Sequence, residues 1–158
     1  MATEAGPDGL SLTSVVQGDF EAMLALRTVA LRPSLERLGR FDHARSRERF
    51  GAGFVPQHMH HIVREDEGRI GFVTLKPKDD QVLLLDHLYL LLRDGQRGRG
   101  VGAWVMRWAK LRARGRSIDV TALRHSDANR FYLRHGFVQV GEETWDLHYR
   151  WQAMPSCA

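Results

Sequence analysis

The stretch VLLLDHLYLLLRDGQRGRGVGAWVMRW, residues 82–108, determines how the fold is interpreted. Its first half is a Leu-rich apolar run that predicts a buried strand, and its last part has the apolar spacing of a helix. Between them, Gly98, Gly100 and Gly102 stand on alternate residues. Glycines let a ligand come close to the backbone, and the first turn of a helix has unpaired N–H groups. The stretch therefore predicts a strand, an anion-binding loop and a helix.

The charges of this loop favour the same interpretation. Arg97 and Arg99 add positive charge beside the glycines, so we expect a phosphate or a pyrophosphate as the anion. The alternative is an ordinary tight turn between a strand and a helix.

Length and composition predict a single domain over residues 1–158. Hydrophobic residues make up 43% of the chain and charged residues 27%, which is typical of a globular domain. The longest apolar run, residues 88–92, is too short to cross a bilayer. Residues 1–9 resemble a disordered leader and not a signal peptide, so a cytoplasmic location is expected. The one cysteine, Cys157, excludes an internal disulfide and a cysteine-based metal site.

The net charge of +4 suits an anionic small molecule as well as a nucleic acid. Two groups of basic residues, within residues 45–49 and 107–116, have helical spacing among apolar residues, which favours solvated helix faces. We therefore expect no nucleic-acid partner. The histidines within residues 58–61 have no acidic partner at a recognisable spacing, so no metal site is expected.

The first part of the chain predicts one strand followed by helices. Residues 10–16 alternate weakly, as in a strand. Capping residues, a proline and a glycine then mark two helices and a turn: a helix from Asp19 that Pro33 stops, a turn over residues 35–38 before Gly39, and a helix from Asp42 with Phe50 on its inner side.

From residue 58 on, short strands alternate with helices. Besides the run from Val82, strands are expected at residues 60–65, 69–75, 118–123, 137–140 and 145–151. The helix after the glycine loop has an apolar stripe of Val101, Trp104, Val105, Trp108 and Leu111 and ends at Gly115. A further helix follows over residues 128–135, capped by Ser126 and ended by Gly136. The order predicts one right-handed crossover between parallel strands, in an α+β domain with a mixed sheet of six or seven strands.

Two segments resemble the GNAT N-acetyltransferase superfamily. Arg97-Gly98-Arg99-Gly100-Val101-Gly102 is similar to its acetyl-CoA loop, which has Arg or Gln, two residues, Gly, one residue, then Gly or Ala. Residues 128–137, ANRFYLRHGF, are similar to its Ala-x-x-Phe-Tyr-x-x-x-Gly-Phe segment. Element order matches over residues 58–151. There are two departures: Ser126 stands where relatives often have Asn, and the connection over residues 92–96 is longer than in many relatives.

The resemblance implies a three-layer fold, with helices on both faces of the sheet, and an enzyme that moves the acetyl group of acetyl-CoA directly to a primary amine of a small molecule, peptide or protein. No metal is implied, and a homodimer is expected because dimers are common among similar proteins. The implied acetyl-CoA-binding residues are Leu90 and Leu92, the loop residues Arg97, Gly98, Arg99, Gly100, Val101 and Gly102, and Ser126. Leu91 is an alternative to either leucine, because the longer connection leaves the strand register open by two residues.

Two catalytic residues are expected. Tyr132 stands where the family's usual acid is, and a phenol with an ordinary pKa of about 10 can protonate the leaving thiolate; packing of a helix on the sheet is the other role open to it. His87 is the expected base for the acceptor ammonium, because imidazole titrates near neutrality. Asp86, Asp119, a water chain and a purely structural histidine are alternatives. On the early helices, Arg32 is a candidate for recognising a carboxylate.

Two other functions stay open. Residues 98–103, GRGVGA, also satisfy the dinucleotide fingerprint, with Asp119 about twenty residues further on. The late position of the loop, the single crossover unit and the location of Asp119 inside a strand all disfavour a dinucleotide-binding domain. The second alternative is a GNAT-like module that binds acyl-CoA without turnover.

Overall fold

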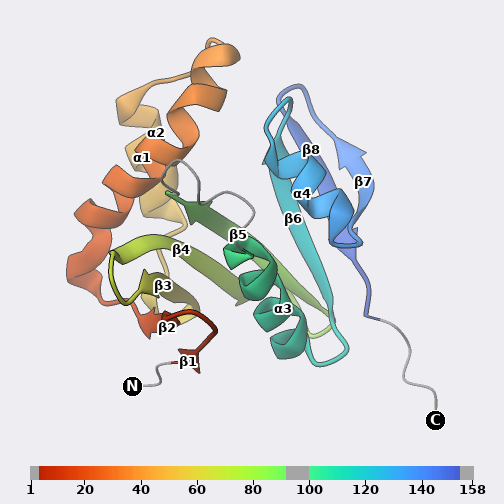
Figure 1. Ribbon diagram of the computed structural model, residues 1–158. Helices are drawn as coiled ribbons and strands as arrows, with labels where there is room; N and C mark the ends of the chain where they lie inside the picture. Colours follow the sequence, from red (N-terminus) through yellow and green to blue (C-terminus); the bar gives the residue numbers. More distant parts are fainter. Residues whose placement is uncertain (1–3, 92–99, 154–158) are drawn as a thin grey trace. The chain divides into compact units, whose positions relative to one another are not determined.

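The computed structural model describes residues 4–91 and 100–153 (Figure 1). Its strands are β1 (Glu4–Ala5), β2 (Leu10–Ser14), β3 (Met59–Arg64), β4 (Gly68–Pro77), β5 (Val82–Leu90), β6 (Ser117–Leu123), β7 (Val138–Glu142) and β8 (Asp146–Trp151). Its helices are α1 (Phe20–Arg37), α2 (His43–Ala52), α3 (Val101–Ala113) and α4 (Ala128–Arg134), with 3-10 turns η1 (Gln17–Asp19) and η2 (Pro56–His58). In the described residues the strands have the order β1-β2-β3-β4-β5-β6-β8-β7. The predicted α+β class with a mixed sheet is confirmed.

The sheet has one strand more than the sequence predicts. The described residues form eight strands, and the additional one is β1, which pairs with β2 through Glu4↔Leu12 and Ala5↔Ser11. A strand of two residues is too short to show the alternation from which a strand is predicted. None of the described helices combines the length and apolar character that crossing a bilayer requires.

The described chain forms two compact units. The first comprises Met1–Thr74 with His87–Val101, and the second comprises Leu75–Asp86 with Gly102–Ala158. The strands β4 and β5 each contribute residues to both units. A single domain over residues 1–158 therefore stays a prediction.

The core of the first unit joins α1 and α2 to the strands β3 and β4, and the two helices lie next to each other in Figure 1. Phe50 of α2 is fully buried, as the sequence predicts. Its ring centroid lies 5.3 Å from that of Phe20 on α1 and 5.6 Å from that of Phe72 on β4. Because burying a Phe side chain contributes about 1.5–3 kcal/mol, this aromatic contact is a main link between the helices and the sheet.

The expected stop of α1 at Pro33 is wrong, because the helix continues to Arg37. Proline cannot donate the hydrogen bond that an N–H at this position would give to the carbonyl of Val29, and its ring pushes that carbonyl outward. Val29 is 60% exposed, so water can hydrate that carbonyl. The helix ends at the predicted glycine instead: Gly39 has φ +67°, its N–H donates to Glu36 O (2.9 Å), and Arg40 N–H donates to Leu35 O (2.8 Å).

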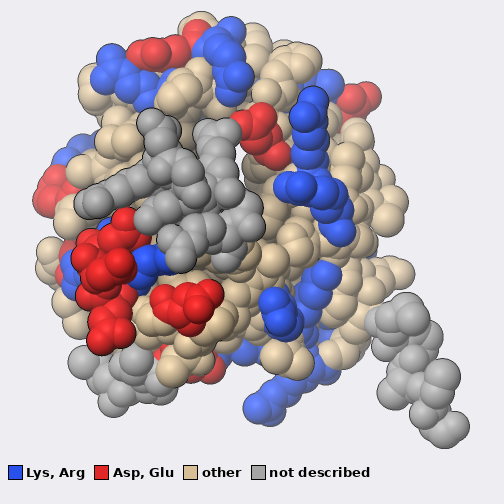
Figure 2. Space-filling view, viewed as in Figure 1, with Lys and Arg blue, Asp and Glu red and all other residues tan. Residues whose placement is uncertain are grey.

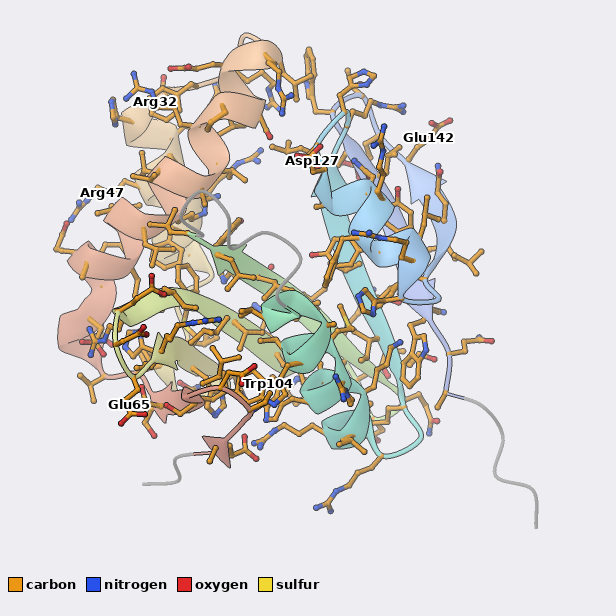
Figure 3. The ribbon with its side chains drawn as sticks, in the orientation of Figure 1. Arg32, Arg47, Glu65, Trp104, Asp127 and Glu142 are labelled. Atoms are coloured by element: carbon orange, nitrogen blue, oxygen red, sulfur yellow. The ribbon has the colours of Figure 1, made fainter. Side chains whose placement is uncertain are left out.

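Two arginines on the outer surface of α1 and α2 are paired with acids. Arg32 Nε donates to Glu36 Oε1 (2.6 Å), and Arg47 forms an ion pair with Glu21. Figure 3 shows both arginines at the outer edge of these helices, and Figure 2 shows basic and acidic side chains intermixed in this area. Mixed charges of this kind are typical of a solvated helix face.

The second unit contains the predicted crossover. β5 and β6 are parallel, with the register Val82↔Ser117 to Leu85↔Val120, and α3 connects them. β6 then pairs antiparallel with β8, and β8 with β7. The predicted apolar stripe of α3 is wrong at Leu111, which is 75% exposed. The buried face is centred on Val105 and Ala109, and Leu111 lies on the opposite side of the helix.

Asp119, in the middle of β6, is held by two cations. Arg150 on β8 donates from Nε and Nη2 to its two carboxylate oxygens (2.6 and 2.9 Å), and Lys78 Nζ donates to Oδ2 (3.1 Å). The hydrogen bonds from Arg150 lower the pKa of Asp119, and Lys78 adds to this against the opposing effect of burial. The carboxylate therefore ties β6 to β8 and is not available as a base.

We expect Asp119→Asn to lower the free energy of unfolding by about 1–2 kcal/mol at pH 7. The loss is small because Arg150 is partly exposed, and solvent screens its interaction with the carboxylate. A carboxyl whose pKa is lowered by folding stabilises the fold above its unfolded pKa of about 3.9. This contribution is lost as the pH falls through the folded pKa. Urea unfolding from pH 7 to pH 2 should therefore show the two proteins converging below about pH 4.

Glu142→Gln is the control for this prediction. Glu142 also pairs with an arginine, Arg124 (2.7 Å), but its side chain is 62% exposed. Removing an exposed pair costs about 0–1 kcal/mol. An equal loss of stability in the two variants would contradict the role assigned to Asp119.

Candidate functional site

The helix α3 begins directly after Gly100, as the glycine loop predicts. Gly100 has φ +80°, and within the described residues no heavy atom beyond its chain neighbours lies within 4 Å of where a Cβ would stand. The first turn of a helix has N–H groups without a partner inside the helix, and at Gly100 the described residues leave the Cβ position uncovered. Val101 is the first helical residue and is buried. The other predicted residues of this region, Leu92, Arg97, Gly98 and Arg99, lie outside the described residues.

Gly102 has a packing role that the sequence does not indicate. A Cβ at this position would lie 2.9 Å from Cε1 and 3.2 Å from Cζ of Phe131 on α4. The absence of a side chain lets the first turn of α3 pack closely against that ring. Gly102 therefore sets how α3 and α4 meet in the second unit.

At the end of β5, some backbone N–H and C=O groups face β4 and others are directed away from it. Leu91 N–H donates to Ile70 O on β4 (2.7 Å), and the Tyr89 carbonyl oxygen faces Gly71 of β4. Successive residues of a strand direct their backbone groups to opposite edges. The N–H and C=O of Leu90 are therefore directed away from β4, whereas Leu91 is already engaged there.

His87 is buried, with 7% of its surface exposed, among the rings of Phe50, Phe72 and Tyr89. A hydrogen bond of 2.8 Å joins its Nδ1 to Thr74 Oγ1. If Nε2 carries the proton, the threonine hydroxyl donates to Nδ1. A role as a base at Nε2 requires the other tautomer, in which Nδ1–H donates to Thr74.

The rival base Asp86 is engaged by a cation. Lys76 Nζ lies 3.2 Å from its Oδ2. Asp86 and His87 are adjacent on a strand, so their side chains point to opposite faces, as the sequence predicts.

Tyr132 lies on α4 in an aromatic cluster and is 6% exposed. Its ring contacts those of Phe131, Phe137 and Tyr149. Tyr149 OH donates to Asn129 Oδ1 (2.7 Å), and burial raises the pKa of this second phenol. The packing fixes the direction of the Tyr132 side chain, which both an acid and a structural role require.

Ser126 is not the cap of α4, contrary to the prediction. The N-cap is Asp127, labelled in Figure 3 at the beginning of the helix. The Ser126 hydroxyl donates instead to Leu123 O (2.9 Å), where Asn129 Nδ2 also donates (2.8 Å). The turn after β6 places His125 at φ 65°, and α4 begins at Ala128, the start that the sequence predicts. Ser126 and Asn129 both tie α4 to the end of β6.

Arg27 is a residue that the sequence reasoning missed. It lies on α1, is 8% exposed, and donates from Nη1 to Ser46 Oγ on α2 (2.7 Å). Its guanidinium carbon lies 5.9 Å from the centroid of Phe50 and 5.9 Å from that of Tyr89. The predicted carboxylate-binding residue, Arg32, is engaged on the surface with Glu36 and lies over Phe41.

In the described part of the chain, no group of three His, Cys, Asp or Glu side chains could hold a metal ion. The first unit contains the end of β5, a buried histidine and a buried arginine, and the second unit contains the first turn of α3 from Gly102 on and two tyrosines. Backbone N–H groups at a helix start can hold an anion, and side chains of these types can move protons.

A sequence profile described as the acetyltransferase (GNAT) domain matches residues 56–139, more than half of the chain. The chain therefore belongs to the GNAT acetyltransferase family. A search among curated proteins found no significant match.

Solved structures resemble the chain in fold. The PaiA N-acetyltransferase from Thermoplasma acidophilum in complex with coenzyme A is 14% identical, with a TM-score of 0.69 over 91% of this chain and 99% of the other. Ard1 from Thermoplasma volcanium is 13% identical, with a TM-score of 0.67 over 92% and 99%. A histone acetyltransferase HPA2 and related acetyltransferase from Corynebacterium glutamicum is 18% identical, with a TM-score of 0.64 over 99% of both chains. These likenesses show the predicted GNAT fold.

Proposed function

We propose that this protein is an acetyl-CoA-dependent N-acetyltransferase that moves the acetyl group directly to a primary amine of a small molecule, peptide or protein. The main support for the proposal is the family match over residues 56–139. This range includes β5, the start of α3 after Gly100, and α4. Acetyl-CoA is the donor in this family, and the thioester supplies an activated acyl group.

The described residues fit such a donor. The N–H groups of the first turn of α3 suit the diphosphate, and no heavy atom of the described residues beyond the chain neighbours lies within 4 Å of the Cβ position of Gly100; Gly98, Arg97 and Arg99 are further proposed contacts. The backbone of Leu90, directed away from β4, suits the amides of the pantetheine arm. Leu92 is a further contact that we propose from the family resemblance alone. We also retain Ser126 as a proposed contact, although its hydroxyl is engaged with Leu123.

Transfer needs two proton movements. The amine nitrogen attacks the thioester carbon, a C–N bond forms, and the C–S bond breaks with its electron pair left on sulfur. Tyr132 donates its phenolic proton to that thiolate, and His87, as the Nε2 base, takes the proton that the acceptor ammonium must lose. A water chain is the alternative route for the second proton.

The rival dinucleotide function is disfavoured by Asp119. The fingerprint needs an acidic side chain free to bind a ribose hydroxyl, whereas Asp119 is bound by Arg150 and Lys78 within β6. Thermal unfolding with each ligand separates the two functions, because a ligand that binds the folded state raises Tm. Acetyl-CoA should raise Tm and NAD should not.

The decisive test follows release of the coenzyme A thiol from acetyl-CoA with a panel of primary amines, amino acids and peptides. Release that depends on an acceptor supports the enzyme. Tight binding of acetyl-CoA without release for any acceptor supports the non-catalytic module instead. A cytoplasmic location and a homodimer are further proposals, tested by fractionation and by sedimentation.

Tyr132→Phe is expected to lower kcat by about 10²–10⁴-fold while leaving the Kd for acetyl-CoA nearly unchanged, because only the proton donor is lost. Steady-state kinetics and calorimetric titration measure the two quantities. Tyr149→Phe is the matched control: it removes a neighbouring phenol that donates to Asn129, so it should cost about 1 kcal/mol of stability and keep most of kcat. An unchanged kcat in Tyr132→Phe would contradict the acid role.

A further inference from the structure

The first unit contains a buried cation whose hydrogen bonds are incomplete. A guanidinium has five N–H donors, and Arg27 uses Nη1 to donate to Ser46 Oγ (2.7 Å). Its Nε is buried, and no described residue forms a hydrogen bond with it. In the described residues no Asp or Glu forms an ion pair with Arg27. Burying a charge in this way is costly unless an anion accompanies it.

The aromatic neighbours of Arg27 offset only part of this cost. Its guanidinium lies 5.9 Å from the centroids of both Phe50 and Tyr89. Cation–π contacts stabilise the charge but accept no N–H hydrogen bonds in the plane of the guanidinium. A guanidinium presents its Nε–H and a neighbouring Nη–H in parallel, so an Nε–H without a partner among the described residues suits a planar, bidentate acceptor, which is the geometry of a carboxylate.

The position of Arg27 relates it to the proposed reaction. Phe50 and Tyr89 also contact the ring of His87, at centroid distances of 5.3 and 5.8 Å. Arg27 and His87 thus share the same two aromatic rings in the first unit. Tyr89 directly precedes Leu90 on β5 and is partly exposed, so the cluster reaches the surface.

We propose that Arg27 binds a carboxylate of the acceptor, and that the acceptor is consequently an amino acid or another small primary amine that carries a carboxylate. The inference rests on the proposed acetyl transfer. Arg27 supplies two parallel N–H donors to the carboxylate, Ser46 holds the guanidinium, and the amine of the same molecule lies on the side of the aromatic rings where His87 is.

The opposing explanation is a purely structural arginine. Replacing a structural buried ion by a neutral side chain of similar size is often neutral or stabilising. In that case the enzyme would not distinguish an acid from its amide. The acceptor chemistry, tested on the unmodified protein, therefore decides between the two explanations without any variant.

The experiment compares amino acids with their carboxamides as acceptors, by release of the coenzyme A thiol, in the wild type, Arg27→Gln and Arg27→Lys. We expect kcat/KM of the wild type to favour the acid by about 100-fold, because the amide leaves the buried cation without its anion. Arg27→Gln should lose this preference, and Arg27→Lys should recover only part of it, since a lysine cannot bind bidentately. The Kd for acetyl-CoA should stay unchanged in all three.

Arg47→Gln is the matched control, because Arg47 is an exposed arginine of the same unit, paired with Glu21. It should keep the preference for acids. Thiol release that is equally fast with acids and amides in the wild type would overturn this inference and leave the acetyltransferase intact. If no acceptor causes thiol release and no amino acid raises Tm, both the role of Arg27 and the proposed acetyltransferase function are overturned.

Discussion

Gly71→Ala is expected to destabilise the protein by at least about 3 kcal/mol, the largest effect on stability that we predict. An added Cβ would collide with the backbone carbonyl oxygen of Tyr89 and lie 2.9 Å from Leu90 Cδ2 and 3.1 Å from the Tyr89 carbonyl carbon. The oxygen belongs to the backbone of β5 and cannot rotate away. The following residues on β4, Phe72 and Val73, are fully buried, so β4 has no room to move.

Denaturant unfolding of Gly71→Ala measures this loss, and Gly18→Ala is the control. Gly18 lies in the turn η1 of the same unit, and no heavy atom of the described residues is within 4 Å of its Cβ position. An exposed substitution of this kind changes stability by about 0.5 kcal/mol or less. If both variants unfold at the wild-type midpoint, the backbone approach between β4 and β5 is not as close as described.

Boundaries with a local cause were predictable from the sequence. Gly39, Gly115 and Gly136 end helices because each takes a positive φ, and Asp42 caps α2 by accepting a hydrogen bond from Arg45 N–H (3.0 Å). The stop at Pro33 was wrong because solvent exposure of the preceding turn is a tertiary property. The cap at Ser126 was wrong because its hydroxyl is drawn back to the end of β6. Sequence rules for helix ends predict the hydrogen bonds of a capping side chain only where all its possible partners are near in sequence.

The same distinction applies to the candidate site. The glycine loop and Tyr132 could be proposed from the sequence because they lie in contiguous motifs. Arg27 was missed because its hydrogen-bond partner is 19 residues away and its aromatic contacts lie on other elements. Asn129 and Tyr149, 20 residues apart, were missed for the same reason. A residue whose role depends on burial among distant segments has no signal in a single sequence.

Gly100→Asp is expected to weaken acetyl-CoA binding by at least about 100-fold, the largest effect on binding that we predict. The substitution places a carboxylate at the N-terminus of α3, where no heavy atom of the described residues beyond the chain neighbours lies within 4 Å of the Cβ position. The carboxylate accepts hydrogen bonds from the N–H groups of the first turn and is stabilised by the helix dipole. It therefore occupies the donors proposed for the diphosphate and repels its charge. Isothermal titration with acetyl-CoA measures the loss.

Gly115→Asp separates this effect from backbone strain. Gly115 follows the other end of α3, with φ +87° against +80° at Gly100, and likewise has no heavy atom of the described residues within 4 Å of its Cβ position. Both variants therefore add the same charge. Both also place a residue with a side chain in the left-handed backbone conformation, which costs a similar conformational free energy of about 1–2 kcal/mol. Only the N-terminal variant should lose binding. Equal Kd values for acetyl-CoA in the two variants would mean that the start of α3 does not hold the diphosphate.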